Sequence, residues 1–534
     1  MINIIGSGLA GLTGAIKASE MGEKVNLISP NYSETSQSVM AMGGINAALD
    51  TKGENDSVKN HYDDTIRGGC EINNPDAVLR LTEKAPEIVK WLESLGVSFT
   101  RDENDNIDLR YFGGQKKART AYADARTGKQ LVTALISKCR QKEAQGNVKR
   151  YIGWRMLSLV IEDGKCMGVI CINEDTSEIR SFEGSVILAS GGYNSLFGKT
   201  SGSTLNDGYV TAKALLQGVK LANLEMIQYH PTTVQSSSKR MLITEAARGE
   251  GGNLYVIRDG KPWYFMKEWY PELAELMPRD VVSRSIYEAS EAGRHEVYLD
   301  ITHLSEHTVK VRLDEVYEVC TKYLNLDPTK QPIPVFPGIH YFMGGIKTDD
   351  EHKTNIEALF AAGECSCQYH GANRLGGNSL LGAIHGGYVA AESAVKCNVE
   401  VDGRKIKKSL ENETRFLNSW NNSSDGIPIK EFENQLSKIM NDSMGIFRDG
   451  DDLSEALGKL NDLTTDINVN NYYEFIKINA LMKLAEASLK CALARKESRG
   501  SHQRRDYPDS DDDYKKITSV IFDGEIRISF EGLK

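Results

Sequence analysis

Five polar side chains, in separate apolar or glycine-rich stretches, have the chemistry to bind a small dicarboxylic acid. Arg279 and Arg374 can each grip a carboxylate through two parallel N–H bonds. His230, Thr244 and His340 supply further hydrogen-bonding groups. Each residue alone has a plain structural reading, such as a packed histidine or an arginine at a helix start. Together they predict a site for a doubly charged acid.

A second pair of charged residues has the spacing of a proton relay. Glu245 and Arg248 lie three residues apart in TEAARGEGG and share one face if this stretch is helical. They could exchange protons with each other and with a neighbouring group. The alternative is a surface ion pair beside a turn.

The stretch HGANRLGGNSLLGAIHGG, residues 370–387, sets Arg374 in a glycine-rich turn before a helical run that starts near Ser379. Glycines let backbone N–H groups come close to a ligand, and a helix N-terminus favours an anion. We expect this loop to hold a ligand.

The chain begins with a strand–turn–helix unit. The apolar run INII leads into GSGLAG and a helix, and a second apolar run ends at Ser29. Gly6, Gly8 and Gly11 form the G-x-G-x-x-G pattern of a βαβ dinucleotide site. Ser29 stands where an acid usually binds the ribose, which weakens a nicotinamide reading more than a flavin one. A second glycine turn ends VILASGGY, as in a flavoprotein Rossmann domain whose chain returns to the cofactor.

The remaining elements follow from hydrophobic periodicity and turn residues. Helical patterns cover residues 82–97 and 128–144, and alternation over 147–189 is typical of a β-meander. Residues 225–335 are mixed, with a short helix expected at PELAEL (271–276). Beyond 398 the chain is mainly helical, with a long amphipathic helix at 472–497 and a hairpin at 518–532.

Composition narrows the class of protein. The 534 residues are 26% charged and 40% hydrophobic with a net charge of −10, which does not suit a nucleic-acid binder. No apolar run is long enough to span a membrane, and no signal peptide precedes the first strand. We expect a cytoplasmic protein, at a membrane face only through partners. The nine cysteines are scattered and never spaced C-x-x-C, so we expect no metal or iron–sulfur site in this chain.

A resemblance to a known family rests on motifs that occur in order along the chain. They are GSGLAG, HPT, TEAARGEGG, PRDVVSRS, HYFMGGI, GANRLGGNSLL and ARKESRGSHQRRDYP. In this order they resemble the flavoprotein subunits of fumarate reductases and succinate dehydrogenases. That family also contains L-aspartate oxidase and soluble fumarate reductases. The resemblance covers essentially the whole chain and implies an FAD enzyme.

The resemblance implies a role for each candidate residue. Arg279 would transfer a proton to or from the substrate carbon opposite flavin N5, and Glu245 and Arg248 would resupply it. The dicarboxylate would be bound by His230, Thr244, His340 and Arg374. FAD would be bound by Gly6, Ser7, Gly8, Leu9, Ala10, Gly11, Ser29, Ser36, Gln37, Ser38, Gly43, Gly44, Asp207, Glu364, Ser379 and Leu380.

The motifs and elements together predict an α/β fold with an interrupted cofactor domain. A Rossmann-like FAD-binding domain would comprise residues 1–224 and 337–397. A mixed α+β capping domain, 225–336, would interrupt it. A C-terminal helical domain, 398–497, and a tail with a hairpin, 498–534, would complete the chain.

One departure from the family concerns cofactor attachment. Membrane-complex members usually link FAD covalently to a histidine, but SQSVMAMGG has Gln37 at that position. Glutamine cannot form this bond, so we expect non-covalent FAD. Covalent attachment raises the flavin potential in this family, so its absence favours fumarate reduction over succinate oxidation. Met42 replaces a residue that is usually Gln or Glu in the family.

Another departure weighs against L-aspartate oxidase. That enzyme has a glutamate before G-G-H to meet the substrate ammonium, whereas RYFGGQ has Phe112 there and Gln115 after the glycines. We therefore predict a fumarate reductase flavoprotein. Oxidative succinate dehydrogenase, L-aspartate oxidase and a flavin-bearing binding protein without turnover stay open as alternatives. Electrons would come from an iron–sulfur partner subunit or a diffusible reduced carrier.

Overall fold

A five-stranded parallel sheet forms the framework at the N-terminal end of the chain. The computed structural model describes residues 1–124, 126–236, 240–397, 399–420, 426–463, 467–469 and 471–533. The strand order is β19-β10-β1-β2-β6, and every neighbouring pair is parallel. The strands are β1 (Ile2–Ile5), β2 (Val25–Ser29), β6 (Val148–Ile152), β10 (Ser185–Leu188) and β19 (Leu359–Ala361). Four of them read as unbroken buried runs, as expected for a sheet covered on both faces.

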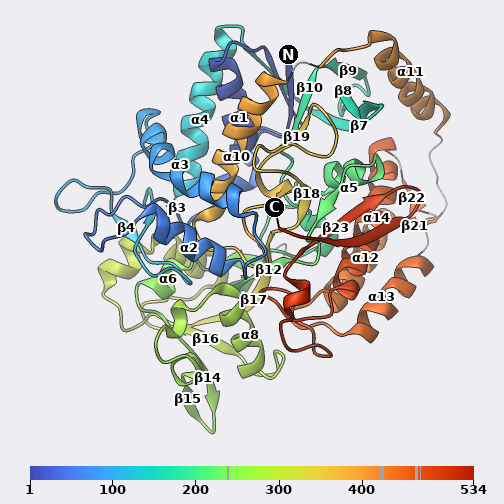
Figure 1. Cartoon of the computed structure of the whole chain (residues 1–534). Helices are drawn as coiled ribbons and strands as arrows, with labels where there is room; N and C mark the ends of the chain where they lie inside the picture. Colours follow the sequence, from blue (N-terminus) through green and yellow to red (C-terminus); the bar gives the residue numbers. More distant parts are fainter. Residues whose placement is uncertain are drawn as a thin grey trace.

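Helices cover one face of this parallel sheet. A small antiparallel sheet contacts its strands β2 and β10. Helices α1 (Leu9–Glu20), α4 (Thr127–Ala144) and α10 (Asn378–Lys396) pack beside one another in Figure 1. Strands β7 (Trp154–Glu162), β8 (Lys165–Asn173) and β9 (Ile179–Glu183) form an antiparallel meander. The predicted meander over 147–189 is therefore confirmed for its middle strands, while β6 and β10 at its ends join the parallel sheet.

A six-stranded sheet with helices occupies the lower left of Figure 1. Its order is β13-β12-β17-β16-β14-β15. The strands are β12 (Ile227–Gln235), β13 (Arg240–Leu242), β14 (Asn253–Arg258), β15 (Lys261–Trp263), β16 (Val297–Asp300) and β17 (Ile333–Phe342). Its helices are α6 (Ala246–Gly249), α7 (Phe265–Trp269), α8 (Arg279–Ala289) and α9 (Asp314–Val319). These elements have their own apolar core, which includes Leu254, Val282 and Leu299.

The prediction of a helix at 271–276 is wrong. Only one 3-10 turn forms, Ala274–Leu276, because Ala274 adopts a left-handed φ of 44° that an α-helix cannot contain. Pro278 follows two residues later and keeps Met277 extended, at ψ 157°. The chain then enters α8 at Arg279, with Asp280 in the first turn.

The C-terminal third is helical and ends in a hairpin. Its helices are α11 (Gly403–Ser419), α12 (Ile429–Ser443), α13 (Gly450–Asp462) and α14 (Tyr472–Ala494). Strands β23 (Ile517–Phe522) and β24 (Ile526–Glu531) pair antiparallel, as predicted. Through β11 (Leu221–Ala222) they extend a sheet with β18 (Gly345–Lys347) and β20 (Ser366–Cys367). The C-terminal hairpin thus joins a sheet whose other strands come from distant parts of the chain (Figure 1).

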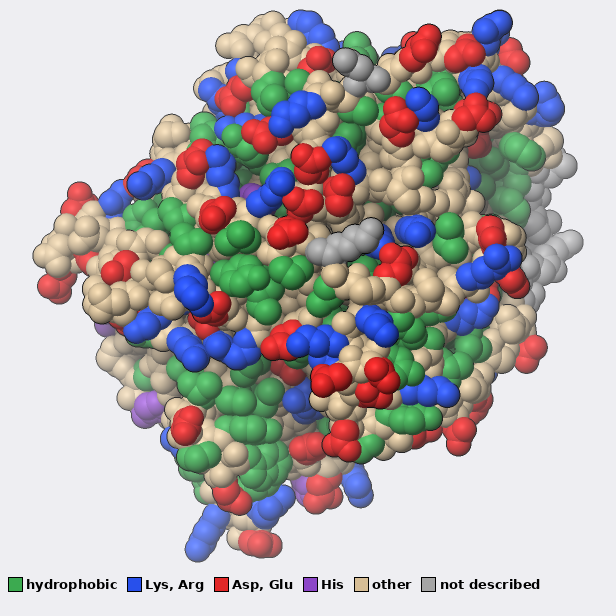
Figure 2. Space-filling model, viewed as in Figure 1, with side chains coloured by type: hydrophobic (Ala, Val, Ile, Leu, Met, Phe, Trp, Pro, Cys, Tyr) green, Lys and Arg blue, Asp and Glu red, His purple; other side chains and the backbone are tan. Residues whose placement is uncertain are grey.

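Acidic and basic side chains are interspersed over the face drawn in Figure 2. Among the described residues, no helix has both the length and the apolar character needed to cross a membrane.

Candidate active site

One cavity brings together nearly all of the predicted site residues. It extends from the first glycine turn to the six-stranded sheet, and its wall includes every candidate except Gly11 and Arg248. Gly11 serves packing instead, because a Cβ there would meet the Gly6 carbonyl oxygen at 1.9 Å. Arg248 lies behind Glu245, buried at 2% exposure.

The first glycine turn leaves the start of α1 open to the cavity. Gly6 has φ 113°, and a Cβ on it would lie 2.2 Å from the Ala189 carbonyl oxygen. Gly8 is the N-cap of α1 and offers no side chain to its N–H groups. The Leu9 N–H donates to Ser38 Oγ at 3.3 Å, and the other donors of this turn and the helix dipole are available to an anion such as a pyrophosphate.

A second uncapped helix start faces the same cavity. Gly377, at φ 82°, precedes α10 and provides no side-chain cap, and Ser379 and Leu380 of the first turn line the cavity. Glu364 also lines it, and burial raises the pKa of this carboxyl to about 7. The Ser36 hydroxyl has no hydrogen-bond partner among the described residues. Two free helix starts and an orphaned hydroxyl suit a long phosphate-bearing cofactor.

Three predicted cofactor contacts are already held by protein groups. The Ser29 hydroxyl accepts from Ser7 Oγ at 3.0 Å and donates to the Asn31 carbonyl at 2.8 Å. Gln37 Oε1 accepts from the Ser203 N–H at 2.5 Å. Asp207 is fixed on the cavity wall by two residues that the sequence did not indicate. Arg155 Nη1 lies 3.1 Å from its carboxylate, and Tyr473 donates its hydroxyl at 2.9 Å.

At the other end of the cavity, three charged residues form a buried chain. Arg279 donates to Glu245 Oε2 from Nε at 2.8 Å and from Nη2 at 2.6 Å. Arg248 Nη2 lies 3.5 Å from Glu245 Oε1, which also accepts from the Gly113 N–H at 2.7 Å. Burial alone would raise the pKa of Glu245, but Arg279 and Arg248 outweigh it and hold this pKa below its usual value. The carboxyl is therefore ionised, and the predicted Glu245–Arg248 contact forms.

Two neutral histidines stand beside this chain. The rings of His230 and His340 lie 5.2 Å apart, edge to face. Burial, and then the charge of Arg279, lowers the pKa of both rings well below 6.5. Thr232 N lies 3.3 Å from His230 Nδ1, and Ser201 Oγ lies 2.8 Å from His340 Nδ1. The Ser201 hydroxyl also donates to the Ile339 carbonyl at 3.0 Å, and His230 Nδ1 also lies 3.2 Å from the Thr232 carbonyl. Each Nδ1 is thus engaged by protein groups, and each Nε2 is left for a ligand.

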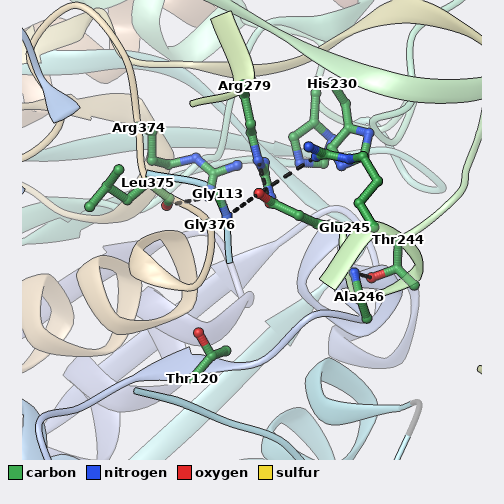
Figure 3. Close-up of polar contacts among 12 residues, drawn as sticks. Gly113, Thr120, His230, Thr244, Glu245, Ala246, Arg279, Arg374, Leu375 and Gly376 are labelled. Carbon is green, nitrogen blue, oxygen red and sulfur yellow. Dashed lines mark hydrogen bonds and ion pairs between the residues drawn. The ribbon is translucent and has the colours of Figure 1, made fainter. Parts of the chain in front are cut away.

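Arg374 reaches the same space from the glycine-rich loop before α10. Figure 3 shows its guanidinium group beside the guanidinium group of Arg279 and the carboxylate of Glu245. Within the described ranges Arg374 forms no ion pair; its Nη2 donates to Gln228 Oε1 at 2.9 Å. Burial, and then the charge of Arg279, lowers the pKa of Arg374 to about 9. The guanidinium carbon of Arg374 lies 4.4 Å from the centre of the Tyr341 ring.

Thr244 and Phe112 complete the wall of this end. The Thr244 hydroxyl accepts from the Ala246 N–H at 3.4 Å, a long bond that leaves it free to turn toward a ligand. Phe112 is buried at 2% exposure and brings no charge to the cavity.

Comparison with known proteins identifies the class. Residues 2–380 match a model described as an FAD binding domain, and residues 433–534 match one described as fumarate reductase flavoprotein C-term. The chain belongs to the fumarate reductase and succinate dehydrogenase flavoprotein family. It is an FAD oxidoreductase with an α/β cofactor fold and a C-terminal helical part.

Particular relatives carry both activity names of the family. The chain is 39% identical to the succinate dehydrogenase flavoprotein subunit of Bacillus subtilis, covering 97% of this chain and 93% of that one. It is 34% identical to a fumarate reductase (CoM/CoB) subunit of Methanothermobacter marburgensis, covering 99% and 98%. The FrdA chain of E. coli quinol fumarate reductase, solved as a variant, aligns with a TM-score of 0.94 at 30% identity, over 100% and 96% of the two chains.

Proposed function

We propose that this chain reduces fumarate to succinate. The observation that carries the proposal is the buried Arg279–Glu245–Arg248 chain. Its first two residues line the same cavity as two uncapped helix starts and Arg374, which has no acid partner among the described residues. Fumarate reduction needs a hydride at one alkene carbon and a proton at the other. FAD, when bound, supplies the hydride.

Substrate binding follows from charge and donor placement. Arg374 would grip one carboxylate through two N–H groups, since no described acid competes for it. In the tautomer that carries the proton on Nε2, His230 and His340 would hold the other carboxylate together with the Thr244 hydroxyl. Because both histidines are neutral, they would donate hydrogen bonds without adding charge.

Proton delivery follows from the geometry of Arg279. Its two bonds to one Glu245 oxygen fix the plane of the guanidinium group. After Arg279 gives a proton to the substrate carbon, the ionised Glu245 would take one from Arg248 across 3.5 Å and pass it to Arg279, and a proton from the medium would then restore Arg248. Arg248 is anchored for this role through its Nη1, which donates to the Glu275 carbonyl at 2.6 Å.

The cofactor would rest on the residues that line the rest of the cavity. The N–H groups at the start of α1 would hold the pyrophosphate, and Ser379 and Leu380 would contact the flavin ring. Gln37 stands where a covalent link would need histidine, so the FAD would be non-covalent. That supports the reductive direction.

Succinate oxidation is the second candidate, because the relative at 39% identity is named as a succinate dehydrogenase subunit. The named relatives are called subunits, so we propose that this chain too works beside a partner that carries electrons, an iron–sulfur protein by its expected chemistry. A diffusible reduced carrier is the alternative.

An anaerobic assay tests the proposal. Without oxygen, the FAD-loaded chain is given reduced viologen with fumarate, or oxidised dye with succinate. A separate aerobic assay gives the same preparation L-aspartate and measures peroxide. Fumarate-dependent viologen oxidation as the fastest reaction supports the proposal. Faster succinate oxidation favours the second candidate, and activity on none of the acids refutes both.

A further inference from the structure

A neutral amide, Gln228, joins the two arginines that face the cavity. Its Oε1 accepts from Arg279 Nη1 at 3.2 Å and from Arg374 Nη2 at 2.9 Å. The side chain comes from β12, whereas Arg279 starts α8 and Arg374 lies in the loop before α10. Gln228 has no exposed surface, so water cannot replace these bonds. One oxygen atom therefore fixes the separation of the two guanidinium groups.

The orientation of this amide is set by its other end. Gln228 Nε2 donates to Asn373 Oδ1 at 2.9 Å and to the Arg374 carbonyl at 2.6 Å. A flipped amide would turn its N–H groups toward two cationic donors and leave both acceptors unpaired. The oxygen must face the arginines. The side-chain amide of Gln228 thus holds Arg279, the Asn373 side chain, and both the backbone and the side chain of Arg374.

The charge of this residue matters as much as its shape. Arg279 already shares the negative charge of Glu245, while Arg374 has no acid partner within the described part of the chain. An acidic residue at position 228 would offer similar oxygen positions but would neutralise Arg374. The free positive charge would then no longer be available to a dianion.

We propose that Gln228 is a positioning residue that also sets specificity for doubly charged acids. As an acceptor it aligns Arg279 with Arg374, and as a neutral group it leaves their charge to the substrate. The inference rests on the proposed dicarboxylate function and adds to it a residue that touches neither the Glu245–Arg248 pair nor the solvent.

Two variants separate the two parts of this role. Gln228→Glu keeps the shape and adds charge, whereas Gln228→Met keeps the approximate length and removes the hydrogen bonds. Gln217→Glu is a matched control, because Gln217 also uses both amide atoms, at 2.9 Å and 2.8 Å, on the Leu159 backbone and lies outside the cavity wall. Bound FAD and the thermal unfolding midpoint are measured for each protein.

Calorimetric titration with succinate and fumarate gives the binding readout, and viologen-driven turnover gives kcat. We expect Gln228→Glu to weaken dianion binding by about tenfold or more, since like charges at a binding site cost several kcal/mol. Gln228→Met should retain more affinity but lose turnover, because Arg279 is no longer aligned. Gln217→Glu should match the wild type in both.

The outcomes distinguish this inference from the function on which it rests. If the wild type binds neither acid, the proposed function and the inference both fail. If the wild type binds and Gln228→Glu binds equally well, only the inference fails. Equal losses in both Gln228 variants, together with loss of FAD, would mean a purely structural role and would also overturn it.

Discussion

Arg279→Lys tests the proton-donor role most directly, because it keeps the charge and removes the planar fork. Arg279 makes three hydrogen bonds, two to Glu245 Oε2 and one to Gln228 Oε1. A lysine ammonium can keep one bond to the carboxylate but cannot span both partners. The remaining two are hydrogen bonds with a charged donor, each worth about 1.5–3 kcal/mol. Their loss removes up to about 3–6 kcal/mol of orienting interaction.

This range matches what positioned proton transfer contributes. General acid catalysis is worth about 10²–10⁴-fold, or about 2.7–5.4 kcal/mol. We therefore expect fumarate turnover to fall by about two to four orders of magnitude. FAD content should be unchanged, because Arg279 lies at the far end of the cavity from α1, and the substrate dissociation constant should change little while Arg374 remains.

Arg284→Lys is the matched control on the same helix. Arg284 Nη1 donates to Asp280 Oδ2 and to the Gly500 carbonyl, both at 3.0 Å, and it is absent from the cavity wall. Its substitution should alter turnover by less than about threefold, as surface changes usually do. Stopped-flow turnover and calorimetric binding are measured on the same preparations. Near-normal turnover of Arg279→Lys would refute the donor role, and a parallel loss of binding would make Arg279 a binding residue instead.

Four further predictions rest on the same geometry. Denaturation in acid should release all FAD, because Gln37 cannot form a histidyl link; flavin fluorescence on the denatured chain in a gel would contradict this. Arg374→Ala should weaken fumarate binding by about 3–5 kcal/mol, the cost of leaving one charge of a buried pair unmatched, and an unchanged dissociation constant would remove Arg374 from the site. With Phe112 offering no counter-charge, peroxide production from L-aspartate should be far slower than fumarate turnover, and comparable rates would overturn that reading. Since the pKa of His340 is depressed on folding, the unfolded state takes up a proton below about pH 6.5, so stability is lost as pH falls. Between pH 7.5 and 5.5 this histidine should account for about 1.4 kcal/mol, and His340→Gln should lose that much less in urea unfolding; an equal loss in both proteins would mean that the ring is already charged in the fold.

Much of the site could be predicted from sequence because its charged residues sit in short, distinctive stretches. Glycine turns indicate the predicted cofactor end of the cavity, and an arginine within a glycine-rich turn indicates its predicted substrate end. The contacts that hold these residues were not visible. Gln228, Arg155 and Tyr473 are ordinary residues in ordinary elements, and their partners come from distant parts of the chain. One signal could have pointed to Gln228: it lies two residues before His230 on β12, the spacing of one face of a strand.

The secondary structure shows the same division between local and non-local signals. The hairpin and α14 follow from periodicity and were predicted. The segment 271–276 has helix-forming residues, but the chain must turn sharply here to bring Arg279 to the cavity. The backbone of Ala274 is left-handed for that turn, at φ 44°. At this point the position that the fold requires of α8 overrides the local helix propensity.

The contacts across the cavity suggest how the substrate and the cofactor are kept in register. Between Arg374 and the start of α10 the chain has only three residues, and the Gly376 carbonyl accepts from Asn46 at 2.8 Å and Gln115 at 2.9 Å. Arg374, the proposed carboxylate-binding group, and the helix start proposed to face the flavin are therefore held as one unit. The proposed proton relay belongs instead to the predicted capping segment, 225–336. It meets that unit through Gln228, which holds the Arg374 backbone, and it meets the first part of the predicted FAD-binding domain through the Gly113 bond to Glu245. If the capping segment moved away, both contacts would break, and Arg279 would leave Arg374 together with His230 and Thr244, which belong to the same segment. Movement of this segment would therefore change proton delivery and part of substrate binding together, which is why turnover and affinity must be measured on the same variants.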